Sequence, residues 1–225
     1  MTNYTDKKML FKEVEQQAKG VVLSHHEIEI LRFVHEFGFC EIGQIMKRFD
    51  LRKSSAYLHM QLLVRLGLVL HLRIALNRPG VYYLTTKSIR LLDLDLPVLE
   101  RIPLSVYDHQ LAVVNVHLQC RERYRDTVWI SERRLIKDKY IDTSNLQDHL
   151  PDGAIVFPDG SQCAIEVERS LKSRKRIEAI LLEYGLQRTF KEVWYFGSER
   201  ITSVIKEMAN SMAFIKTFDL EEFLK

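Results

Sequence analysis

The chain has 225 residues, of which 46% are hydrophobic and 28% are charged. This length and composition suit a globular protein of two compact domains and argue against disordered and fibrous classes. The formal net charge is only +3, from 33 Lys and Arg against 30 Asp and Glu, so binding to a polyanion would depend on where the basic side chains lie.

Neither secretion nor membrane insertion is indicated. The cysteines Cys40, Cys120 and Cys163 lie far apart and form no C-x-x-C pair, which argues against a disulfide framework and a zinc ribbon. The N-terminal residues contain no apolar signal-peptide core, and no run approaches the roughly 18 apolar residues that a membrane-spanning helix needs. We therefore expect a cytoplasmic protein.

The first segment, residues 1–23, is predicted to contribute one helix ahead of the first domain. The helix would cover residues 5–19 and carry Met9, Leu10 and Val14 as apolar contacts. We expect it to pack on the domain that follows or on a second subunit, so a homodimer is one possible state.

Three helices and a β-hairpin are predicted next. Ser24 and Glu27 have the spacing of a capping box, so a helix begins there, and Gly38 marks its end. The stretches "EIGQIMKRFD" and "RKSSAYLHMQLLVRLGLV" predict the second and third helices, the third with Leu58, Leu62 and Leu66 on its apolar stripe. Two β-rich runs around the turn cluster at residues 77–80 predict the hairpin.

This order of elements, over residues 24–90, resembles the winged helix-turn-helix DNA-binding domain, whose third helix enters the major groove. The resemblance implies a set of DNA-binding side chains at the start of the third helix and on the wing. They are Arg52, Lys53, Ser54, Ser55, Tyr57, His59, Arg73 and Arg78. One alternative is that these side chains form a solvated helix face. Another is that the domain is a protein-interaction module, a role that winged helices also serve.

A domain boundary is expected where Pro97 and Pro103 interrupt the periodic pattern. The winged helix would then occupy residues 24–103 and a second domain residues 104–225.

The second domain is predicted to be a mixed sheet flanked by helices, in the α/β (α+β) class. Its order is helix, strand, β-hairpin, helix, strand, helix, strand, with Ser170 as the cap of the second helix. The segments are "SVYDHQLAVVNVHLQCRERY", "DTVWISERRL", the hairpin within residues 149–168, "SLKSRKRIEAILLEYGLQ", "EVWYFG", "ERITSVIKEMANSM" and "AFIKTFDL".

Three acids are predicted to meet at the open end of the hairpin. Asp159 and Gly160 form a strong turn signal, and a turn there places Asp152 opposite residues 166–168. Glu166 and Glu168 share one strand face because side chains alternate along a strand. A small divalent cation such as Mg²⁺ takes carboxylate ligands and would relieve the repulsion between the acids.

Pro151-Asp152 followed by Glu166-x-Glu168 resembles the PD-(D/E)xK nuclease signature, in the variant where glutamate replaces the final lysine. The resemblance implies that Asp152, Glu166 and the carbonyl of Val167 hold Mg²⁺ or Mn²⁺. It also implies that Glu168 orients or deprotonates the attacking water.

The replaced lysine leaves the charge on the phosphate without its usual stabiliser, and Lys172 is our candidate for that role. Glu132 is a candidate for a further metal ligand, and Lys175 for phosphate binding. The alternative for Lys172 is a solvated helix end or general phosphate binding, and the alternative for Lys175 is a solvated helix end.

The nuclease resemblance covers residues 105–225. Together with the winged helix and the stretch "YDHQLAVVNV", it is similar to the plasmid replication-relaxation family and its MOBC-type relaxases. This implies a site- and strand-specific endonuclease that nicks a double-stranded plasmid origin of transfer to start conjugative mobilization, with a conjugation coupling protein as a possible partner. The alternatives are a non-catalytic DNA-binding relaxosome accessory protein or transcriptional regulator, and a protein-interaction module.

The sequence contains no histidine cluster of the kind that other relaxases use. His109, His117 and His149 are dispersed, and we interpret each as structural or as a surface residue. Tyr140 and Tyr184 remain open as nucleophiles, with packing as the alternative for both. We favour water as the nucleophile.

Overall fold

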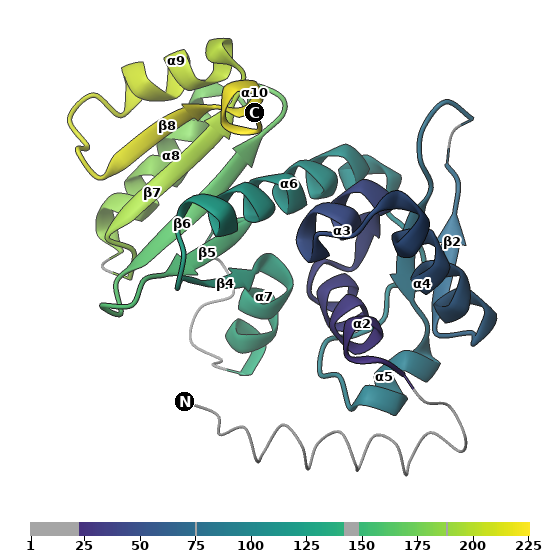
Figure 1. The fold of residues 1–225 in the computed structure, drawn as a ribbon. Coiled ribbons are helices and arrows are strands. Elements are labelled where there is room, and N and C mark those ends of the chain that lie inside the picture. Colours follow the sequence, from purple (N-terminus) through teal and green to yellow (C-terminus); the bar gives the residue numbers. More distant parts are fainter. Residues whose placement is uncertain (1–22, 75, 142–148, 188) are drawn as a thin grey trace. The chain divides into compact units, whose positions relative to one another are not determined.

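The computed structural model describes residues 23–74, 76–141, 149–187 and 189–225, so the helix predicted over residues 5–19 lies outside the described residues. The chain divides into two compact units, Met1–Ile102 and Pro103–Lys225 (Figure 1). Each unit is described by itself.

The first unit has the element order of a winged helix. Its three strands form one antiparallel sheet in the order β1-β3-β2. The elements are α2 (His25–Phe37), β1 (Phe39–Glu41), α3 (Ile42–Phe49), α4 (Lys53–Arg65), β2 (Val69–Leu72), β3 (Val81–Leu84) and α5 (Thr86–Leu92). The predicted helices and hairpin are confirmed. The short strand β1 was not predicted, because three residues are too few to show a period of two.

The first helix begins and ends at the residues that the sequence indicates. The backbone N–H of Glu27 donates to Ser24 Oγ at 3.3 Å, and the backbone N–H of Ser24 donates to Glu27 Oε2 at 2.6 Å. These two bonds are the capping box. Gly38 ends the helix with φ of 81°, a conformation that a residue without Cβ adopts without strain.

The predicted apolar stripe of α4 is wrong. Leu58 is 66% exposed, whereas Ala56, Met60 and Leu63 are fully buried. Both sets recur at helical spacing, so the period alone did not distinguish the buried stripe from the exposed one.

The second unit is a five-stranded mixed sheet with helices on both faces. The sheet order is β4-β5-β6-β7-β8, with antiparallel pairing from β4 to β6 and parallel pairing from β6 to β8. After a 3-10 turn (Leu104–Val106), the elements are α6 (Tyr107–Arg123), β4 (Val128–Ser131), α7 (Glu132–Ile141), β5 (Gly153–Val156), β6 (Gln162–Glu168), α8 (Arg174–Leu186), β7 (Glu192–Gly197), α9 (Glu199–Met208), β8 (Ile215–Asp219) and α10 (Leu220–Phe223). The predicted mixed sheet with flanking helices is confirmed.

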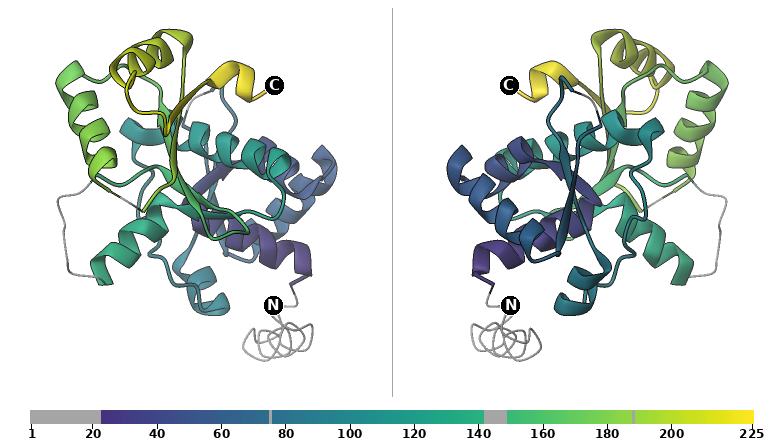
Figure 2. Two further views of the ribbon diagram at one scale, coloured as in Figure 1. Left: turned by 90° about the vertical axis from the view of Figure 1, so that its left-hand side faces the viewer. Right: turned by 90° about the vertical axis from the view of Figure 1, so that its right-hand side faces the viewer.

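Alternation along β6 assigns its side chains to two cores. Cys163, Ile165 and Val167 pack with residues of α6 and α10. Ala164 packs with residues of α8 and α9 on the opposite face, and α6 and α8 lie on opposite sides of the sheet in Figure 2. Because side chains two apart share a face, Glu166 lies on the α8 side with Ala164.

Three local predictions in this unit need correction. The predicted strand over residues 126–135 ends at Ser131, whose Oγ accepts from the backbone N–H of Arg134 at 3.3 Å and begins an unpredicted helix, α7. Ser173, not Ser170, caps α8 by accepting from the backbone N–H of Arg176. The final short helix α10 was also missed. For α7 and α8 the cap signal is a serine followed by helix-forming residues, and several serines compete for it. Helix α10 is capped instead by Asp219, whose Oδ1 accepts from the backbone N–H of Glu222 at 3.0 Å.

None of the described helices is long and apolar enough to cross a membrane.

Candidate active site

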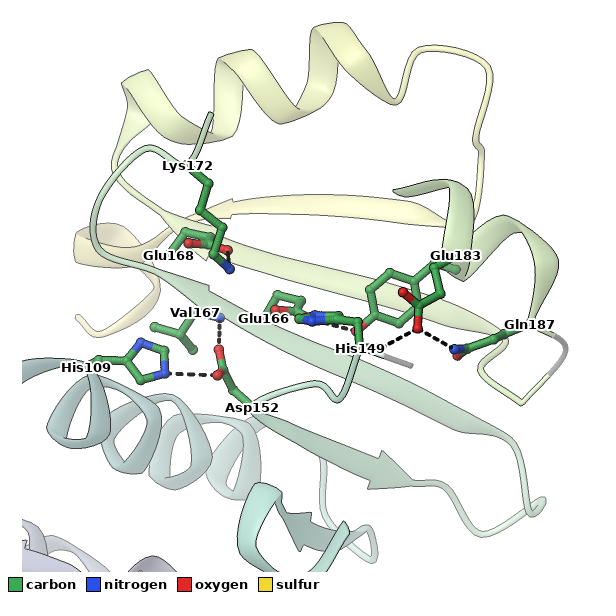
Figure 3. Close-up of polar contacts among 10 residues, drawn as sticks. His109, His149, Asp152, Glu166, Val167, Glu168, Lys172, Glu183 and Gln187 are labelled. Carbon is green, nitrogen blue, oxygen red and sulfur yellow. Dashed lines mark hydrogen bonds and ion pairs between the residues drawn. The ribbon is translucent and has the colours of Figure 1, made fainter. Parts of the chain in front are cut away.

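The candidate site lies where β6 extends beyond β5. The last residue pair between these strands is Gly153 and Ile165, whereas β6 continues beside β7 until Glu168. The residue that precedes β5 is Asp152, and its Oδ2 accepts a hydrogen bond from the backbone N–H of Val167 at 2.7 Å (Figure 3). A side chain therefore replaces the backbone acceptor that β5 would otherwise supply.

The turn between β5 and β6 sets this register. The backbone N–H of Phe157 donates to the carbonyl of Ser161, and that of Gly160 donates to the carbonyl of Phe157, both at 2.9 Å. Gly160 has φ of 81°, which favours glycine. The turn at Asp159 and Gly160 was predicted, and it brings Asp152 to the far end of β6 as expected.

The carbonyl of Val167 faces the same strand edge as its N–H, because both backbone groups of one residue point to one neighbouring strand. The N–H bonds the carboxylate of Asp152. The predicted main-chain ligand thus lies on the edge where the predicted side-chain ligand lies.

Glu166 is the most deeply buried of the acids, with 1% of its surface exposed. Its Oε1 accepts from His149 Nε2 at 2.6 Å and from the Tyr184 hydroxyl. Burial raises the pKa of Glu166, the hydrogen bond from His149 partly offsets this, and the charge of Asp152 raises the pKa further.

His149 is fixed at both ends. Its ring bonds Glu166, and its backbone N–H donates to Glu183 Oε1 from α8. Burial alone would lower the pKa of His149, but the hydrogen bond and charge of Glu166 outweigh burial and raise it. The bond to Glu166 thus favours protonation of His149, whereas burial favours the neutral form of Glu166.

Glu168 Oε1 pairs with Lys172 Nζ, which comes from the loop between β6 and α8. Burial raises the pKa of Glu168, and the bond to Lys172 partly offsets it. Lys172 does not lie at the helix start as predicted, because α8 begins two residues later, but its ammonium group still reaches the acids (Figure 3).

Asp152 Oδ1 pairs with His109 Nε2 of α6 at 2.9 Å. Burial acts to lower the pKa of His109, and the bond and charge of Asp152 outweigh it and raise that pKa. Asp152 thus joins the end of β5, the edge of β6 and helix α6.

Glu132 is the first residue of α7, directly after β4, and not the end of a strand. Burial raises the pKa of Glu132, and the charge of Asp152 raises it further. The charge of Asp152 also raises the pKa of Glu166 and of Glu168. The acids therefore form one electrostatically coupled group.

The chemistry of this group fits a hard divalent cation, since carboxylates and a main-chain carbonyl are the ligands that Mg²⁺ and Mn²⁺ prefer. Within the described residues, no set of three or more His, Cys, Asp or Glu side chains is already arranged to hold a metal ion. The carboxylates instead bond two imidazoles and an ammonium group. Metal binding would require these side chains to exchange partners.

The sequence reasoning missed the roles of His109 and His149, which it interpreted as structural or surface residues. Each bonds a predicted metal ligand. His149 lies three residues before Asp152, and such closeness to a predicted ligand was an available signal. His109 carried no local signal, because α6 meets β5 only in the folded chain.

Of the two tyrosines considered as nucleophiles, the structure describes the side chain of Tyr184 alone. The hydroxyl of Tyr184 is buried against Glu166, and burial together with that acid raises its pKa. A phenol that resists ionisation and has no solvent access is a poor nucleophile. The side chain of Tyr140 lies outside the described residues.

The predicted DNA-binding side chains of the first unit lie at the start of α4 and on the wing. Arg52, Lys53 and Ser54 are exposed, and Ser55 and Tyr57 are half-buried.

Other members of this predicted set have partners in their own unit. His59 Nδ1 bonds Glu27 Oε1 of α2 at 3.1 Å. Arg73 Nη2 donates to the carbonyl of Leu76 within the wing, and Arg78 is exposed there. Lys175, in the second unit, is exposed in the first turn of α8.

Comparison with known proteins identifies no family. No family model matches the chain, and no curated protein matches it. The solved structures that align include the organohalide-sensing transcriptional regulator RdhR-CbdbA1625 in its ligand-free form, with 13% identity, a TM-score of 0.32 and coverage of 62% of this chain and 72% of that one. The adhesin competence repressor AdcR from Streptococcus pyogenes aligns with 13% identity, a TM-score of 0.30 and coverage of 63% and 95%. PigF with SAH aligns with 10% identity, a TM-score of 0.20 and coverage of 96% and 64%. At these scores the likenesses carry no argument, and the proposals below rest on the residues of this chain.

Proposed function

We propose that this chain is a metal-dependent DNA endonuclease whose winged helix binds double-stranded DNA and whose second unit cleaves one strand. The supporting observation is the end of β6, where Asp152, Glu166 and Glu168 form one coupled group beside the edge carbonyl of Val167. In the narrower form of the proposal, the DNA is a plasmid origin of transfer and the protein is a relaxase of conjugative mobilization.

Each residue of the site has a distinct proposed role in phosphodiester hydrolysis. Asp152, Glu166 and the carbonyl of Val167 would hold Mg²⁺ or Mn²⁺, with Glu132 as a further carboxylate. When bound, the metal polarises the phosphoryl oxygen and lowers the pKa of water.

Glu168 is the proposed base, and burial raises its pKa toward the range that suits proton transfer near neutral pH. Lys172 is the proposed stabiliser of charge on the phosphate. It must first release Glu168, with which it pairs in this structure.

Binding to DNA is proposed for the start of α4 and for the wing. Arg52 and Lys53 are exposed at the helix N-terminus, and cationic side chains there can neutralise backbone phosphates. Ser54 and Ser55 supply hydroxyl groups that can bond phosphate or base edges.

A second candidate is a DNA-binding protein without catalytic activity, such as a relaxosome accessory protein or a transcriptional regulator. It is favoured by one observation: each acid of the predicted motif already has a basic partner in its own chain. In that case the acids and bases hold together the end of the sheet.

Nicking of supercoiled plasmid that carries the DNA adjacent to this gene separates the two candidates. We expect the parent to give open circles with Mn²⁺ and none with EDTA, and Glu166→Gln to reduce nicking at least 100-fold because a metal ligand is lost. The matched control is Glu207→Gln, a change at an exposed glutamate that pairs with Arg174, and we expect it to nick like the parent. A footprint on this DNA with intact supercoils would support the second candidate.

The DNA-binding half of the proposal has its own test. Arg52→Ala should reduce the slope of log K against log salt by about 0.9 if this side chain neutralises one phosphate. Arg32→Ala is the control, because Arg32 is an exposed arginine of α2 that pairs with Glu29, and we expect its slope to equal that of the parent. An unchanged slope for Arg52→Ala would contradict the assigned DNA surface.

A further inference from the structure

Tyr195 of β7 carries a buried hydroxyl group without a partner. The residue is 2% exposed, and its hydroxyl has no hydrogen-bond partner among the described residues. A buried O–H without an acceptor costs free energy. Such a group next to a candidate active site is available to any acceptor that comes within reach.

The sheet register places Tyr195 among the acids. In the parallel pairing of β6 with β7, Tyr195 lies opposite Glu166, and Gly197 lies opposite Glu168. Paired residues share a face, and a long side chain also reaches the diagonal neighbour two residues along. The phenol of Tyr195 therefore has Glu166 beside it and Glu168 on the diagonal.

Gly197 contributes no side chain between Tyr195 and Glu168, and Ile201 packs directly against it. A Cβ at this position would lie 3.0 Å from Ile201 Cγ2 and 3.1 Å from the carbonyl oxygen of Glu168. Because the residue opposite Glu168 has no side chain, Tyr195 supplies the nearest polar side chain from β7 on this face.

Tyr195, Glu168 and Lys172 line one small cavity of about 10 Å³, closed mainly by apolar side chains of α8 and α9. This volume is close to the space of one water molecule. Glu168 and Tyr195 therefore border the same small cavity.

The phenol is suited to donate. Burial raises the pKa of Tyr195, and the charges of Glu166, Glu168 and Asp152 raise it further. The hydroxyl thus keeps its proton. In this structure Glu168 is bonded to Lys172, which is the bond that the proposed catalytic role of Lys172 requires to break.

We propose that Tyr195 is a positioning residue whose hydroxyl donates a hydrogen bond to Glu168 when Lys172 releases this carboxylate. The contact holds Glu168 in place while Lys172 turns to the phosphate. The catalytic consequence rests on the proposed nuclease function, whereas the contact itself does not.

The contact is tested by urea unfolding of metal-free protein in two backgrounds. In the parent, Tyr195→Phe removes an unpartnered hydroxyl and should leave the urea midpoint unchanged or raise it. In Lys172→Met, where Glu168 has lost its partner, Tyr195→Phe should lower the midpoint. Lys172→Ala provides a second background for the same comparison.

Tyr184→Phe is the matched control, since the Tyr184 hydroxyl already bonds Glu166. Its effect on the midpoint should be a decrease of the same size with and without Lys172. An equal effect of Tyr195→Phe in the parent and in both lysine variants would overturn the proposed contact.

The positioning role is tested by kinetics of Mn²⁺-dependent nicking. Tyr195→Phe should lower kcat about tenfold, as loss of a group that orients a reacting side chain does, and should leave KM and DNA affinity unchanged. An unchanged kcat would overturn the positioning role. A parent protein that binds DNA but never nicks would overturn the nuclease function, and the two-background unfolding comparison would still decide whether Tyr195 contacts Glu168.

Discussion

Glu166→Gln should make the metal-free protein more stable at pH 8, although it removes a proposed metal ligand. Glu166 is buried, and its carboxylate accepts bonds from His149 and Tyr184. Glutamine keeps the shape and the accepting oxygen and removes the negative charge. The glutamine amide N–H groups are also attracted by the negative charge of Asp152, the same charge that raises the pKa of Glu166.

The sign of the effect follows from the direction of this pKa shift. Burial raises the pKa of Glu166 above its ordinary value of 4.5, even with the opposing bond from His149. A raised pKa means that the folded state favours the neutral group, and each unit corresponds to about 1.4 kcal/mol once the pH exceeds both values. We expect Glu166→Gln to raise the free energy of unfolding at pH 8 by about 0.5 to 2 kcal/mol, the range common for a single stabilising substitution.

The pH dependence has a defined sign. Below pH 4.5, the model-compound value, Glu166 is protonated in the folded and unfolded states, so the parent and the variant should be equally stable. As the pH rises through the higher pKa of the folded state, the parent loses stability and the variant does not. The difference between them should therefore grow with pH and then become constant.

Urea unfolding from pH 4 to pH 8 in EDTA measures this difference. Glu207→Gln is the control, and at a site 65% exposed its effect should stay within about 0.5 kcal/mol. A Glu166→Gln protein that is less stable than the parent at pH 8 would refute the reasoning. It would show that the pair of His149 with ionised Glu166 stabilises the fold by more than burial of the charge costs.

Two further pairs of substitutions test the packing that positions the site and the DNA surface. Gly153→Ala should destabilise the protein by about 1 to 3 kcal/mol, because a Cβ there would lie 2.5 Å from Trp129 Cζ2. The control is Gly185→Ala in α8, where no atom lies within 4 Å of the added Cβ. It should stabilise the protein by up to about 1 kcal/mol. Similar effects at both glycines would contradict the register of β4 and β5. Met60→Ala should lower the free energy of unfolding by about 2 to 5 kcal/mol, and Leu58→Ala by less than about 0.5 kcal/mol. Thermal or urea unfolding measures both effects. The reverse order would mean that the predicted leucine stripe of α4 is buried.

Features set by a few neighbouring residues were predictable from the sequence. Ser24, Glu27 and Gly38 determine the first helix through bonds and a backbone angle within that segment. The turn at Asp159 and Gly160 likewise fixes the register of β5 and β6. From that register alone it followed that Asp152 would reach the end of β6.

Features that depend on packing between distant segments were not predictable. His109 and Asp152 are 43 residues apart in the chain, and their contact exists because α6 packs on the sheet. The exposure of Leu58 has the same origin, since the neighbours of α4 determine which of its two apolar stripes is buried. Periodicity specifies that a stripe exists, and tertiary contacts decide its direction.

The basic partners of the acids explain how this chain can bury them without a cation. Unpaired carboxylates at the end of β6 would repel one another and lose hydration. His109, His149 and Lys172 each place a donor on one of them. The same partners compete with a metal ion, so binding must separate at least the pairs of Asp152 and Glu166. A stable metal-free fold is therefore compatible with either proposed function. Metal-dependent nicking of DNA distinguishes a nuclease from a DNA-binding protein whose acids are neutralised by basic partners.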